Sequence, residues 1–246
     1  FEGFAPPPGL RDMPFSIVIG SHLLPAVGLA MGMQYQGDPG IVMANFGDGA
    51  LSQGAVAEAF NFAAVNRAPC VFCLENNGYA ISMPVERQCA HEVLAQRGVG
   101  FGIPSIRADG NDVLAMITAM KQATDRARAG EGPTLIEAVT YRMGVHTTAD
   151  DPTVYRRDEE LEQWRTRDPI VRFEHYLRSR GHIDDAAIEA VVNDCEQQVK
   201  EARERFEARR AANPFEVFDF MFEELPPELQ RQKDEYLARL SRKGIS

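Results

Sequence analysis

Long apolar runs and an excess of basic residues are both missing from this sequence. A membrane-spanning helix needs about 18 or more consecutive apolar residues, and no run of that length occurs. The 26 lysines and arginines are outnumbered by 36 aspartates and glutamates, so the formal net charge is −10. A nucleic-acid-binding surface requires the opposite balance. We therefore expect a chain that contacts neither membranes nor nucleic acids.

Cysteine is also scarce, which bears on zinc and redox sites. The four cysteines are Cys70, Cys73, Cys89 and Cys195, and the first two form a C-x-x-C. That spacing occurs in zinc and redox sites, but no second pair is present to complete a structural zinc site. The pair also falls in an apolar run typical of a strand, where residues three apart point to opposite faces. We therefore expect buried, unpaired thiols in a protein of the reducing cytoplasm.

Apolar strand-like runs alternate with helix-like segments over the first 150 residues. Strands are expected at 41–46, 70–75, 105–108 and 134–140, and helices at 22–33, 52–65 and 113–129. Asp112 is placed to cap the last of these helices. The apolar face of that helix is expected to comprise Val113, Met116, Ile117 and Met120. Strands and helices that alternate in this way predict an α/β fold with a parallel sheet, in a domain spanning 1–150.

The sequence becomes charged and helical after residue 150. Helix-like segments occupy 158–180, 184–212 and 226–242. In the second of these, apolar residues recur every three or four positions, at Ile188, Val191, Val192, Cys195, Val199, Ala202 and Phe206. A stripe of this kind is the buried face of an amphipathic helix. We predict a helical C-terminal region over 151–246, whose stripe packs either on the sheet domain or on a partner.

Two short polar strings directly follow two of the expected strands. They are Gly47-Asp48-Gly49-Ala50 and Asn76-Asn77-Gly78-Tyr79. In a parallel sheet, the carboxyl ends of the strands are where phosphate ligands bind. Asp48 and Asn77 offer hard oxygen ligands, which suit magnesium rather than zinc. Gly47 and Gly49 let the backbone approach a phosphate closely. The two strings together predict a site for magnesium and a diphosphate.

Two other interpretations of the first string have to be weighed. Asp48 taken alone favours a turn over a metal site, because Asp-Gly is common in turns. A dinucleotide-binding loop needs a third glycine, but the pattern here is Gly47-x-Gly49-x-x-Ser52. A nucleotide-dependent oxidoreductase is therefore disfavoured, and the pairing with the second string favours the metal site.

The spacing of the two strings also resembles a known motif. Gly-Asp-Gly, a gap of 26 residues from 50 to 75, and Asn-Asn are similar to the thiamine diphosphate motif. The stretches 46–80, 107–112 and 140–156, and the tail 221–226, resemble the alpha subunit of the first, decarboxylating component of 2-oxo acid dehydrogenase complexes. Branched-chain and bacterial pyruvate members are both similar. The resemblance implies a thiamine diphosphate-binding α/β fold with a helical C-terminal extension, and an oxidoreductase.

The resemblance implies roles for the residues of the two strings. Asp48, the side chain of Asn77 and the backbone carbonyl of Tyr79 would bind magnesium. Gly49 and Ala50 would donate backbone N–H groups to the diphosphate, beside the close approach at Gly47. Thiamine diphosphate and magnesium are thus the expected cofactors.

Residues outside the two strings also match family positions. Ile17 and Ile19 match positions whose main chain meets the aminopyrimidine ring, although ordinary core packing would explain them as well. His146 matches a histidine of the active-site loop, near the diphosphate and the reacting carbon, where it has a cofactor-binding or catalytic role. The residues expected to order that loop are Arg142, Asp150, Tyr155 and Arg156. Thr147 stands where animal members carry a phosphorylated serine, so serine-directed kinase control is not expected.

The resemblance further implies partners. In the family, the glutamate that activates the aminopyrimidine belongs to a beta subunit, and no matching motif is present here. Two alpha and two beta chains would form the enzyme, which would pass its acyl group to a lipoyl-bearing acyltransferase. Family members also carry residues before the position of Phe1, including a Tyr-Arg pair that grips the diphosphate, so the sequence reads as a fragment or a processed chain.

The substrate is not decided by the resemblance. The strings at 146–151 and 109–112 resemble branched-chain members, whereas Glu75 and the tail resemble bacterial pyruvate members. A branched-chain 2-oxo acid is slightly preferred, pyruvate is close behind, and acetoin is third. A non-catalytic subunit that only scaffolds a partner is the alternative from another functional class.

Overall fold

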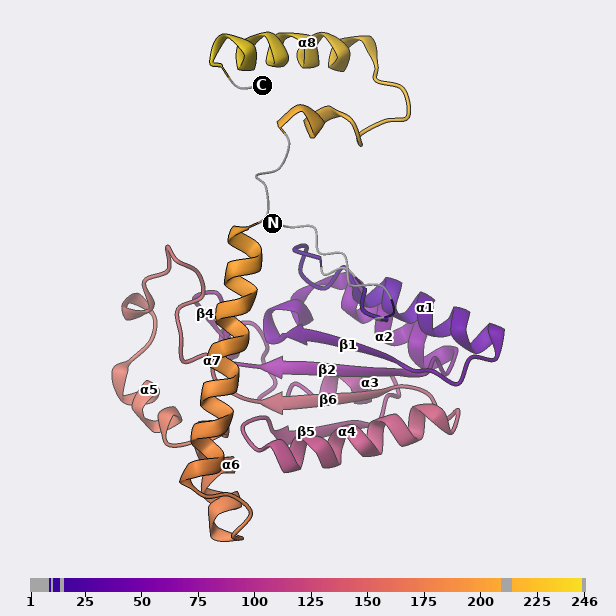
Figure 1. Ribbon diagram of the computed structural model, residues 1–246. Helices are drawn as coiled ribbons and strands as arrows, with labels where there is room; N and C mark the ends of the chain where they lie inside the picture. Colours follow the sequence, from indigo (N-terminus) through magenta and orange to yellow (C-terminus); the bar gives the residue numbers. More distant parts are fainter. Residues whose placement is uncertain (1–8, 10, 14–15, 209–213, 245–246) are drawn as a thin grey trace. The chain divides into compact units, whose positions relative to one another are not determined.

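A computed structural model describes residue 9 and residues 11–13, 16–208 and 214–244 (Figure 1). Contacts divide the chain into two compact units, Phe1–Arg180 and Gly181–Ser246. The boundary expected at residue 150 marks the change from strands to helices, and as a domain boundary it stays a prediction. In the described residues, no helix is long and apolar enough to cross a membrane.

The first unit is built on a parallel sheet, as the alternating sequence pattern predicted. Its strands are β1 (Val42–Gly47), β2 (Cys70–Asn76), β5 (Ser105–Asp109) and β6 (Thr134–Val139), in the order β1-β2-β6-β5. Neighbouring strands are all parallel. β2 lies inside the sheet and is buried on both faces, which explains its nearly continuous apolar sequence. A two-stranded antiparallel sheet, β3 (Tyr79–Ala80) and β4 (Met83–Pro84), was not predicted.

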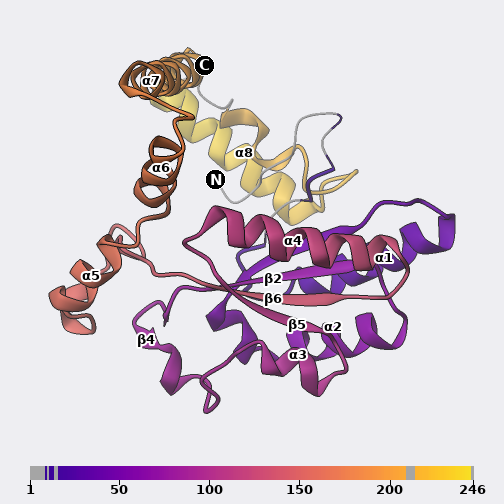
Figure 2. The same ribbon diagram turned by 90° about the horizontal axis from the view of Figure 1, so that it is seen from below.

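Helices cover both faces of the sheet (Figure 2). They are α1 (Leu23–Gln36), α2 (Gly54–Val65), α3 (Gln96–Gly100) and α4 (Val113–Arg128). The larger core cluster includes Phe60 of α2, Phe72 of β2 and Leu135 of β6. α4 covers the opposite face, where Ala119 and Ala123 pack with Val71 and Ile136. The α/β fold class predicted from the sequence is therefore confirmed.

The apolar face of α4 was only partly predicted. Asp112 caps the helix as expected, because its side chain accepts hydrogen bonds from the backbone N–H groups of Leu114 and Ala115. The residues that face the sheet are Met116, Ala119, Met120, Ala123 and Ala127. Val113 and Ile117 are instead exposed, so their assignment to the buried face was wrong. Alanine lets the helix lie close to the sheet, and the stripe of alanines sets which side turns inward.

The helical segment expected over 158–180 is interrupted. It forms α5 (Asp158–Arg165) and α6 (Pro169–Ser179). Asp168 caps α6 by accepting hydrogen bonds from two backbone N–H groups, and proline occupies the first turn. Both features favour the start of a new helix. Trp164 of α5 stacks on Tyr141 with ring centroids 5.1 Å apart.

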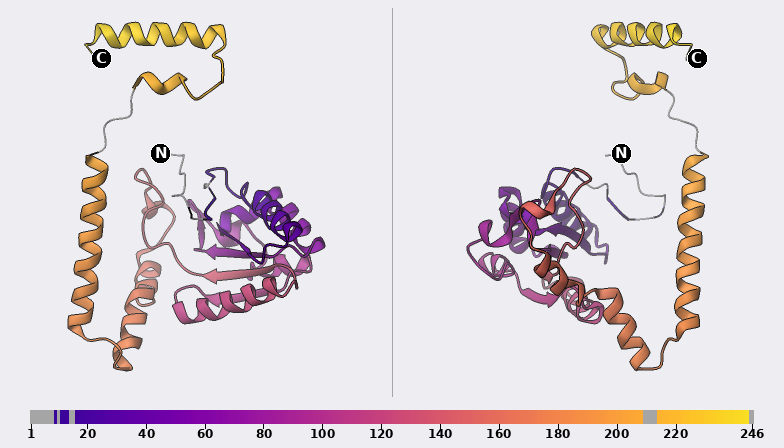
Figure 3. Two further views of the ribbon diagram at one scale, coloured as in Figure 1. Left: turned by 45° about the vertical axis from the view of Figure 1, so that its right-hand side comes forward. Right: turned by 90° about the vertical axis from the view of Figure 1, so that its left-hand side faces the viewer.

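The second unit contains α7 (Asp185–Glu207), the 3₁₀ helix η4 (Pro214–Phe218) and α8 (Pro227–Arg242), shown in orange and yellow in Figure 3. Within the unit, Lys233 of α8 forms an ion pair with Asp219, and Tyr236 contacts Phe218. The predicted apolar stripe lies on α7 and is exposed, with Phe206 at 75%. The expected helices are thus confirmed over the described residues, and positions 209–212 of the segment expected over 184–212 lie outside them. The expected packing of the stripe stays a prediction.

Candidate functional site

The first string places a buried carboxylate at the carboxyl end of β1. Asp48 directly follows the strand, opens the 3₁₀ helix η1 (Asp48–Ser52) and is only 3% exposed. Its Oδ2 accepts a hydrogen bond from Gln88 Nε2 at 3.1 Å. Its Oδ1 is buried and has no hydrogen-bond partner among the described residues. Burial raises the pKa of Asp48, and the hydrogen bond from Gln88 only partly opposes this shift.

The second string lies beside the first at the same edge of the sheet. β1 and β2 pair in parallel with Gly47 opposite Glu75, so both strings follow at the same level. The nearby backbone of Asn77 lowers the pKa of the Asp48 carboxyl against the larger effect of burial. Gly78 then turns the chain with φ of +89°, in the region that favours glycine. The structure thus brings Asp48 and Asn77 together, as the spacing required.

The oxygens that would accompany Asp48 around a metal have partners of their own. Asn77 Oδ1 accepts a hydrogen bond from the backbone N–H of Tyr79 at 3.1 Å. The carbonyl of Tyr79 accepts one from Arg142 at 3.3 Å. Each oxygen has a second lone pair for a further contact.

A metal at this position would not be held by a cluster of ionisable side chains. In the described part of the chain, no three or more His, Cys, Asp or Glu side chains are grouped to hold a metal ion. One carboxylate, one amide oxygen and one backbone carbonyl form an all-oxygen set of low charge. Such a set fits magnesium, which completes its octahedron with phosphate oxygens and water. The unpartnered Oδ1 of Asp48 is the structural observation that supports this fit.

The glycines of the first string differ in their surroundings. A Cβ at Gly49 would lie 2.8 Å from the Cβ of Ala80, so packing against β3 alone excludes a side chain there. A Cβ at Gly47 would meet only the carbonyl oxygen of Glu75, at 4.0 Å. Ala50 lies within η1 and is buried in the core. The chain is therefore closely packed at Gly49 and Ala50 and more open at Gly47.

Ile17 and Ile19 lie in the turn that precedes α1. They are 58% and 53% exposed, so core packing does not account for them. Gly20 ends this turn with φ of +78°. A Cβ on Gly20 would lie 3.0 Å from Val56 of α2 and 3.6 Å from the carbonyl oxygen of Ala50. The turn thus packs beside the junction of η1 and α2, next to the first string.

His146 lies in an exposed loop that a hydrogen-bond network holds in place. Arg142 donates to the Tyr155 hydroxyl at 2.9 Å, and that hydroxyl donates to Asp150 at 2.7 Å. Asp150 also accepts from the backbone N–H of His146 at 2.7 Å. Arg156 donates to the carbonyl of Arg142 at 2.6 Å. These four side chains thus form a connected hydrogen-bond network, and their ordering of the loop stays a prediction.

Arg142 connects this loop to the two strings. Its guanidinium donates to the carbonyls of Tyr79 and Ile81 and approaches His146 Nδ1 at 3.5 Å. The hydrogen bond from the His146 backbone, with that from Tyr155, lowers the pKa of Asp150, so the carboxylate stays charged at neutral pH. His146 is therefore tied through one arginine to the turn that carries Tyr79.

The cysteines lie apart from this chemistry. Cys70 and Cys73 are unpaired and buried in β2. Burial raises the pKa of Cys70 to about 12 and that of Cys73 to about 11. Thiols of this kind are neutral and behave as small apolar side chains, as the strand pattern predicted.

Several residues that support the site were not identified from the sequence. Gln88 holds Asp48 but belongs to no motif. Glu137 is fully buried in β6 and accepts hydrogen bonds from Asn76 and from the backbone of Ala95. The one signal for it was a carboxylate within an otherwise apolar strand. Thr140 donates to the buried side chain of Asn111 at 2.6 Å.

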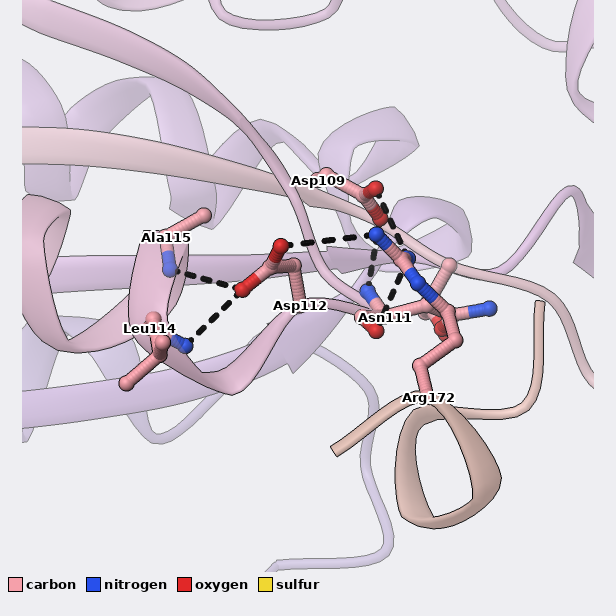
Figure 4. Close-up of polar contacts among 7 residues, drawn as sticks. Asp109, Asn111, Asp112, Leu114, Ala115 and Arg172 are labelled. Atoms are coloured by element: carbon pink, nitrogen blue, oxygen red, sulfur yellow. Dashed lines mark hydrogen bonds and ion pairs between the residues drawn. The ribbon is translucent and has the colours of Figure 1, made fainter. Parts of the chain in front are cut away.

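The string at 109–112 has a structural role (Figure 4). Arg172, from α6, donates to Asp109 at 2.9 Å and to the carbonyl of Asn111 at 3.0 Å, and it also reaches Asp112. A Cβ at Gly110 would lie 2.9 Å from the carbonyl oxygen of Val139, so glycine is required there. The string thus joins β5, β6, α4 and α6 at the carboxyl edge of the sheet.

Comparison with known proteins identifies the family. Residues 9–215 match the family described as "Dehydrogenase E1 component". The chain is 48% identical over 229 residues to the 3-methyl-2-oxobutanoate dehydrogenase subunit alpha of Mycobacterium tuberculosis, which covers 93% of this chain and 62% of that protein. It is 41% identical over 237 residues to a pyruvate dehydrogenase E1 component subunit alpha of Acholeplasma laidlawii, covering 96% and 69%.

A further relative is the pyruvate dehydrogenase E1 component subunit alpha of Staphylococcus aureus, at 39% identity over 243 residues, or 98% of this chain and 66% of that protein. The chain therefore spans less than two thirds of the length of the mycobacterial relative. These matches, together with the two strings at one sheet edge, confirm the resemblance inferred from the sequence. The chain belongs to the dehydrogenase E1 component family.

Proposed function

We propose that this chain is the alpha subunit of a 2-oxo acid dehydrogenase. The enzyme decarboxylates a 2-oxo acid with thiamine diphosphate and magnesium and transfers the acyl group to a lipoyl domain. The observation that carries the proposal is the buried, unpartnered Oδ1 of Asp48 beside Asn77. A buried carboxylate with a free oxygen is costly unless a cation or a proton satisfies it. Family membership implies thiamine diphosphate as the cofactor, and the all-oxygen donor set supports magnesium as the cation.

The cradle comprises Asp48, Asn77, Tyr79 and the backbone at Gly47, Gly49 and Ala50. In this proposal the Asp48 carboxylate, the Asn77 amide oxygen and the Tyr79 carbonyl bind magnesium. The backbone of the three small residues holds the diphosphate, and the main chain at Ile17 and Ile19 meets the aminopyrimidine. The exposed turn beside η1 supports this last assignment. When bound, thiamine diphosphate supplies the carbanion and the electron sink for decarboxylation.

His146 is the catalytic side chain that the proposal assigns to this subunit. Arginine is only a donor, so the contact of Arg142 with Nδ1 makes that nitrogen the acceptor. A neutral His146 then carries its proton on Nε2, which is the nitrogen left to donate to a reacting group. Arg142 and Asp150 hold the ring and its backbone. This orientation supports the proposed role in proton transfer.

The proposal includes a partner that completes the site. The glutamate that activates the aminopyrimidine is assigned to a beta subunit, in an assembly of two alpha and two beta chains. A lipoyl-bearing acyltransferase is the acceptor of the acyl group. A cytoplasmic location stays a prediction, which the buried, unpaired cysteines of β2 support.

A branched-chain 2-oxo acid is the preferred substrate. The mycobacterial relative named for 3-methyl-2-oxobutanoate is 48% identical, against 41% for the pyruvate relative of Acholeplasma. Pyruvate is the second candidate. An acetoin dehydrogenase subunit and a non-catalytic scaffold are the remaining alternatives.

The test is a steady-state assay of the full-length alpha chain assembled with its beta subunit. Carbon dioxide release would be measured on a panel of branched-chain 2-oxo acids and pyruvate, and acetaldehyde release on acetoin, with thiamine diphosphate and either magnesium or a chelator. We expect turnover that requires magnesium and is highest with a branched-chain substrate. Turnover that is highest with pyruvate or acetoin would correct the substrate, and no turnover with any of them would refute an enzymatic role.

A further inference from the structure

A fully buried carboxylate connects the two segments that carry the proposed metal ligands. Glu137 lies in β6 and is 0% exposed. Its Oε1 accepts a hydrogen bond from Asn76 Nδ2 at 2.9 Å, and its Oε2 accepts one from the backbone N–H of Ala95 at 2.8 Å. Arg107 of the neighbouring strand lies 3.5 Å from Oε1. Two donors from distant parts of the chain thus meet on one side chain.

One of these contacts leads to Asn77. Asn76 ends β2, and its Oδ1 accepts a hydrogen bond from the backbone N–H of Gly78 at 3.3 Å. Its carbonyl accepts one from the backbone N–H of Thr140 at 2.9 Å. The side chain of Asn76 therefore shapes the turn in which Asn77 lies, and Glu137 fixes the orientation of that side chain.

The other contact leads to Asp48. Ala95 is the N-cap residue of α3, directly before Gln96. Arg97 of α3 donates to the carbonyl of Leu51 at 2.5 Å, and Leu51 belongs to the 3₁₀ helix that opens with Asp48. Glu137 thus holds the N-terminus of α3, and Arg97 of α3 joins this helix to η1. Both segments that carry proposed metal ligands are therefore connected to the carboxylate of Glu137.

The chemistry of this position requires a carboxylate. A leucine or methionine would fill the same volume without the cost of burying a charge. Glutamine has a single acceptor oxygen, so it would satisfy one donor and turn an N–H₂ group toward the other. Glutamate alone among side chains of this length accepts both hydrogen bonds. From this connection we propose that Glu137 is a positioning residue that sets the separation of Asp48 and Asn77 for magnesium.

This inference rests on the proposed function, and it differs from a merely structural role in one measurable way. Magnesium demands near-ideal octahedral geometry with ligands at about 2.0–2.1 Å, whereas calcium accepts flexible geometry at about 2.3–2.6 Å. A residue that sets ligand spacing should therefore affect magnesium more than calcium. A residue that only stabilises the fold would weaken binding with both ions equally, or would leave binding unchanged.

The experiment measures thiamine diphosphate binding by calorimetry, in magnesium and in calcium, on the full-length alpha chain assembled with its beta subunit. Glu137→Gln should weaken binding in magnesium by roughly 10- to 100-fold, the usual effect of losing a residue that orients metal ligands. Binding in calcium should weaken less, so the ratio of the two affinities changes. Arg107→Gln is the matched control, because it removes the neighbouring charge and leaves both accepted hydrogen bonds in place.

A swap of the two side chains tests the same hydrogen bond in reverse. In Asn76→Asp with Glu137→Gln, the new amide donates to the new carboxylate, and its oxygen still accepts from Ala95. We expect the swap to restore most of the preference for magnesium, whereas Asn76→Asp alone sets two carboxylates against each other. A swap that behaves like Glu137→Gln alone would overturn the proposal.

Failure of the variant to assemble has its own control. Glu137→Asp keeps the charge but draws the carboxylate back by one methylene, so it loses one of the two donors. The same change in the magnesium-to-calcium ratio is expected, and an unchanged ratio would overturn the proposal. If the wild-type complex binds no thiamine diphosphate in magnesium, the proposed function itself fails. If it binds and Glu137→Gln binds equally well with the same ratio, only the positioning role fails.

Discussion

Asp48 is 3% exposed at the end of a strand, whereas His146 lies in an exposed polar loop. The cradle is held by the sheet, by Gln88 and by the buried carboxylate of Glu137. The loop over 142–156 is held mainly by exposed and part-buried hydrogen bonds among its own residues. Segments with few buried apolar contacts open at low cost in free energy. Under the proposed function, the comparison places cofactor binding in the buried part and predicts that the exposed loop, which carries the proposed catalytic histidine, is the part that moves.

The largest effect is expected from the cradle. Asp48→Ala should weaken magnesium-dependent binding of thiamine diphosphate at least about a hundredfold, because contacts to a charged group are worth roughly 1.5–3 kcal/mol each and about 1.4 kcal/mol is tenfold. The fold should persist, since the carboxylate is costly to bury. Calorimetric titration of the full-length complex is the measurement. Asp125→Ala, at an exposed residue that pairs with Lys121, is the control. Near-normal affinity in the Asp48 variant would remove this residue from the site.

A change in the loop should lower the rate of turnover and leave the affinity for the cofactor nearly unchanged, the opposite of a change in the cradle. His146→Ala is expected to lower kcat by roughly a hundredfold, the lower end of what a positioned proton donor contributes. The dissociation constant of thiamine diphosphate should change little, because the cradle is intact. Steady-state kinetics and calorimetry on the same sample separate the two, with the exposed His182→Ala as the control. A loss of cofactor affinity as large as the loss of kcat would place His146 in the cradle instead.

The mobility of the loop gives a smaller and more local effect. Loop 142–156 should exchange its amide hydrogens more slowly once thiamine diphosphate and magnesium are bound. Tyr155→Phe should speed exchange in the cofactor-free loop about fivefold, because it removes the link between Arg142 and Asp150 and a hydrogen bond is worth about 1 kcal/mol net. Exchange in β2 should be unaffected and serves as the internal control. Equal protection of the loop with and without cofactor would contradict the idea that it is the movable part.

The smallest effect concerns the stability of the cofactor-free protein, which burial of the charged Asp48 carboxyl lowers. Burial raises the pKa of Asp48, so this carboxyl supports the fold fully below its ordinary value of 3.8, and that support is lost as the pH rises through the folded-state value. Asp48→Asn should therefore raise the Tm of the cofactor-free complex at neutral pH by about 2–4 °C, as about 1 kcal/mol would. The difference should vanish at a pH low enough to protonate the wild-type carboxyl. A variant that melts lower at neutral pH would show that the charge has a stabilising partner.

The buried cradle and the exposed loop also differ in how much of their structure the sequence predicts. The strands 41–46 and 70–75 were predicted because continuous apolar runs are required of strands buried on both faces. Asp48 and Asn77 were predicted because the carboxyl ends of parallel strands meet at one edge. The break between α5 and α6 was missed although Asp168-Pro169 is a signal for a helix start, and the charged pattern on both sides concealed it.

The sequence by itself determined the α/β fold class and the sheet edge at which the two strings lie, because periodicity, glycine positions and string spacing are local properties. Only the tertiary structure decided the contacts of Glu137, whose donors come from positions 76 and 95. It also decided which residues of α4 face the sheet, because Val113 and Ile117 are more apolar than the alanines that turn inward. A hydrogen bond between distant positions leaves no periodic trace, and close packing selects for shape as much as for hydrophobicity.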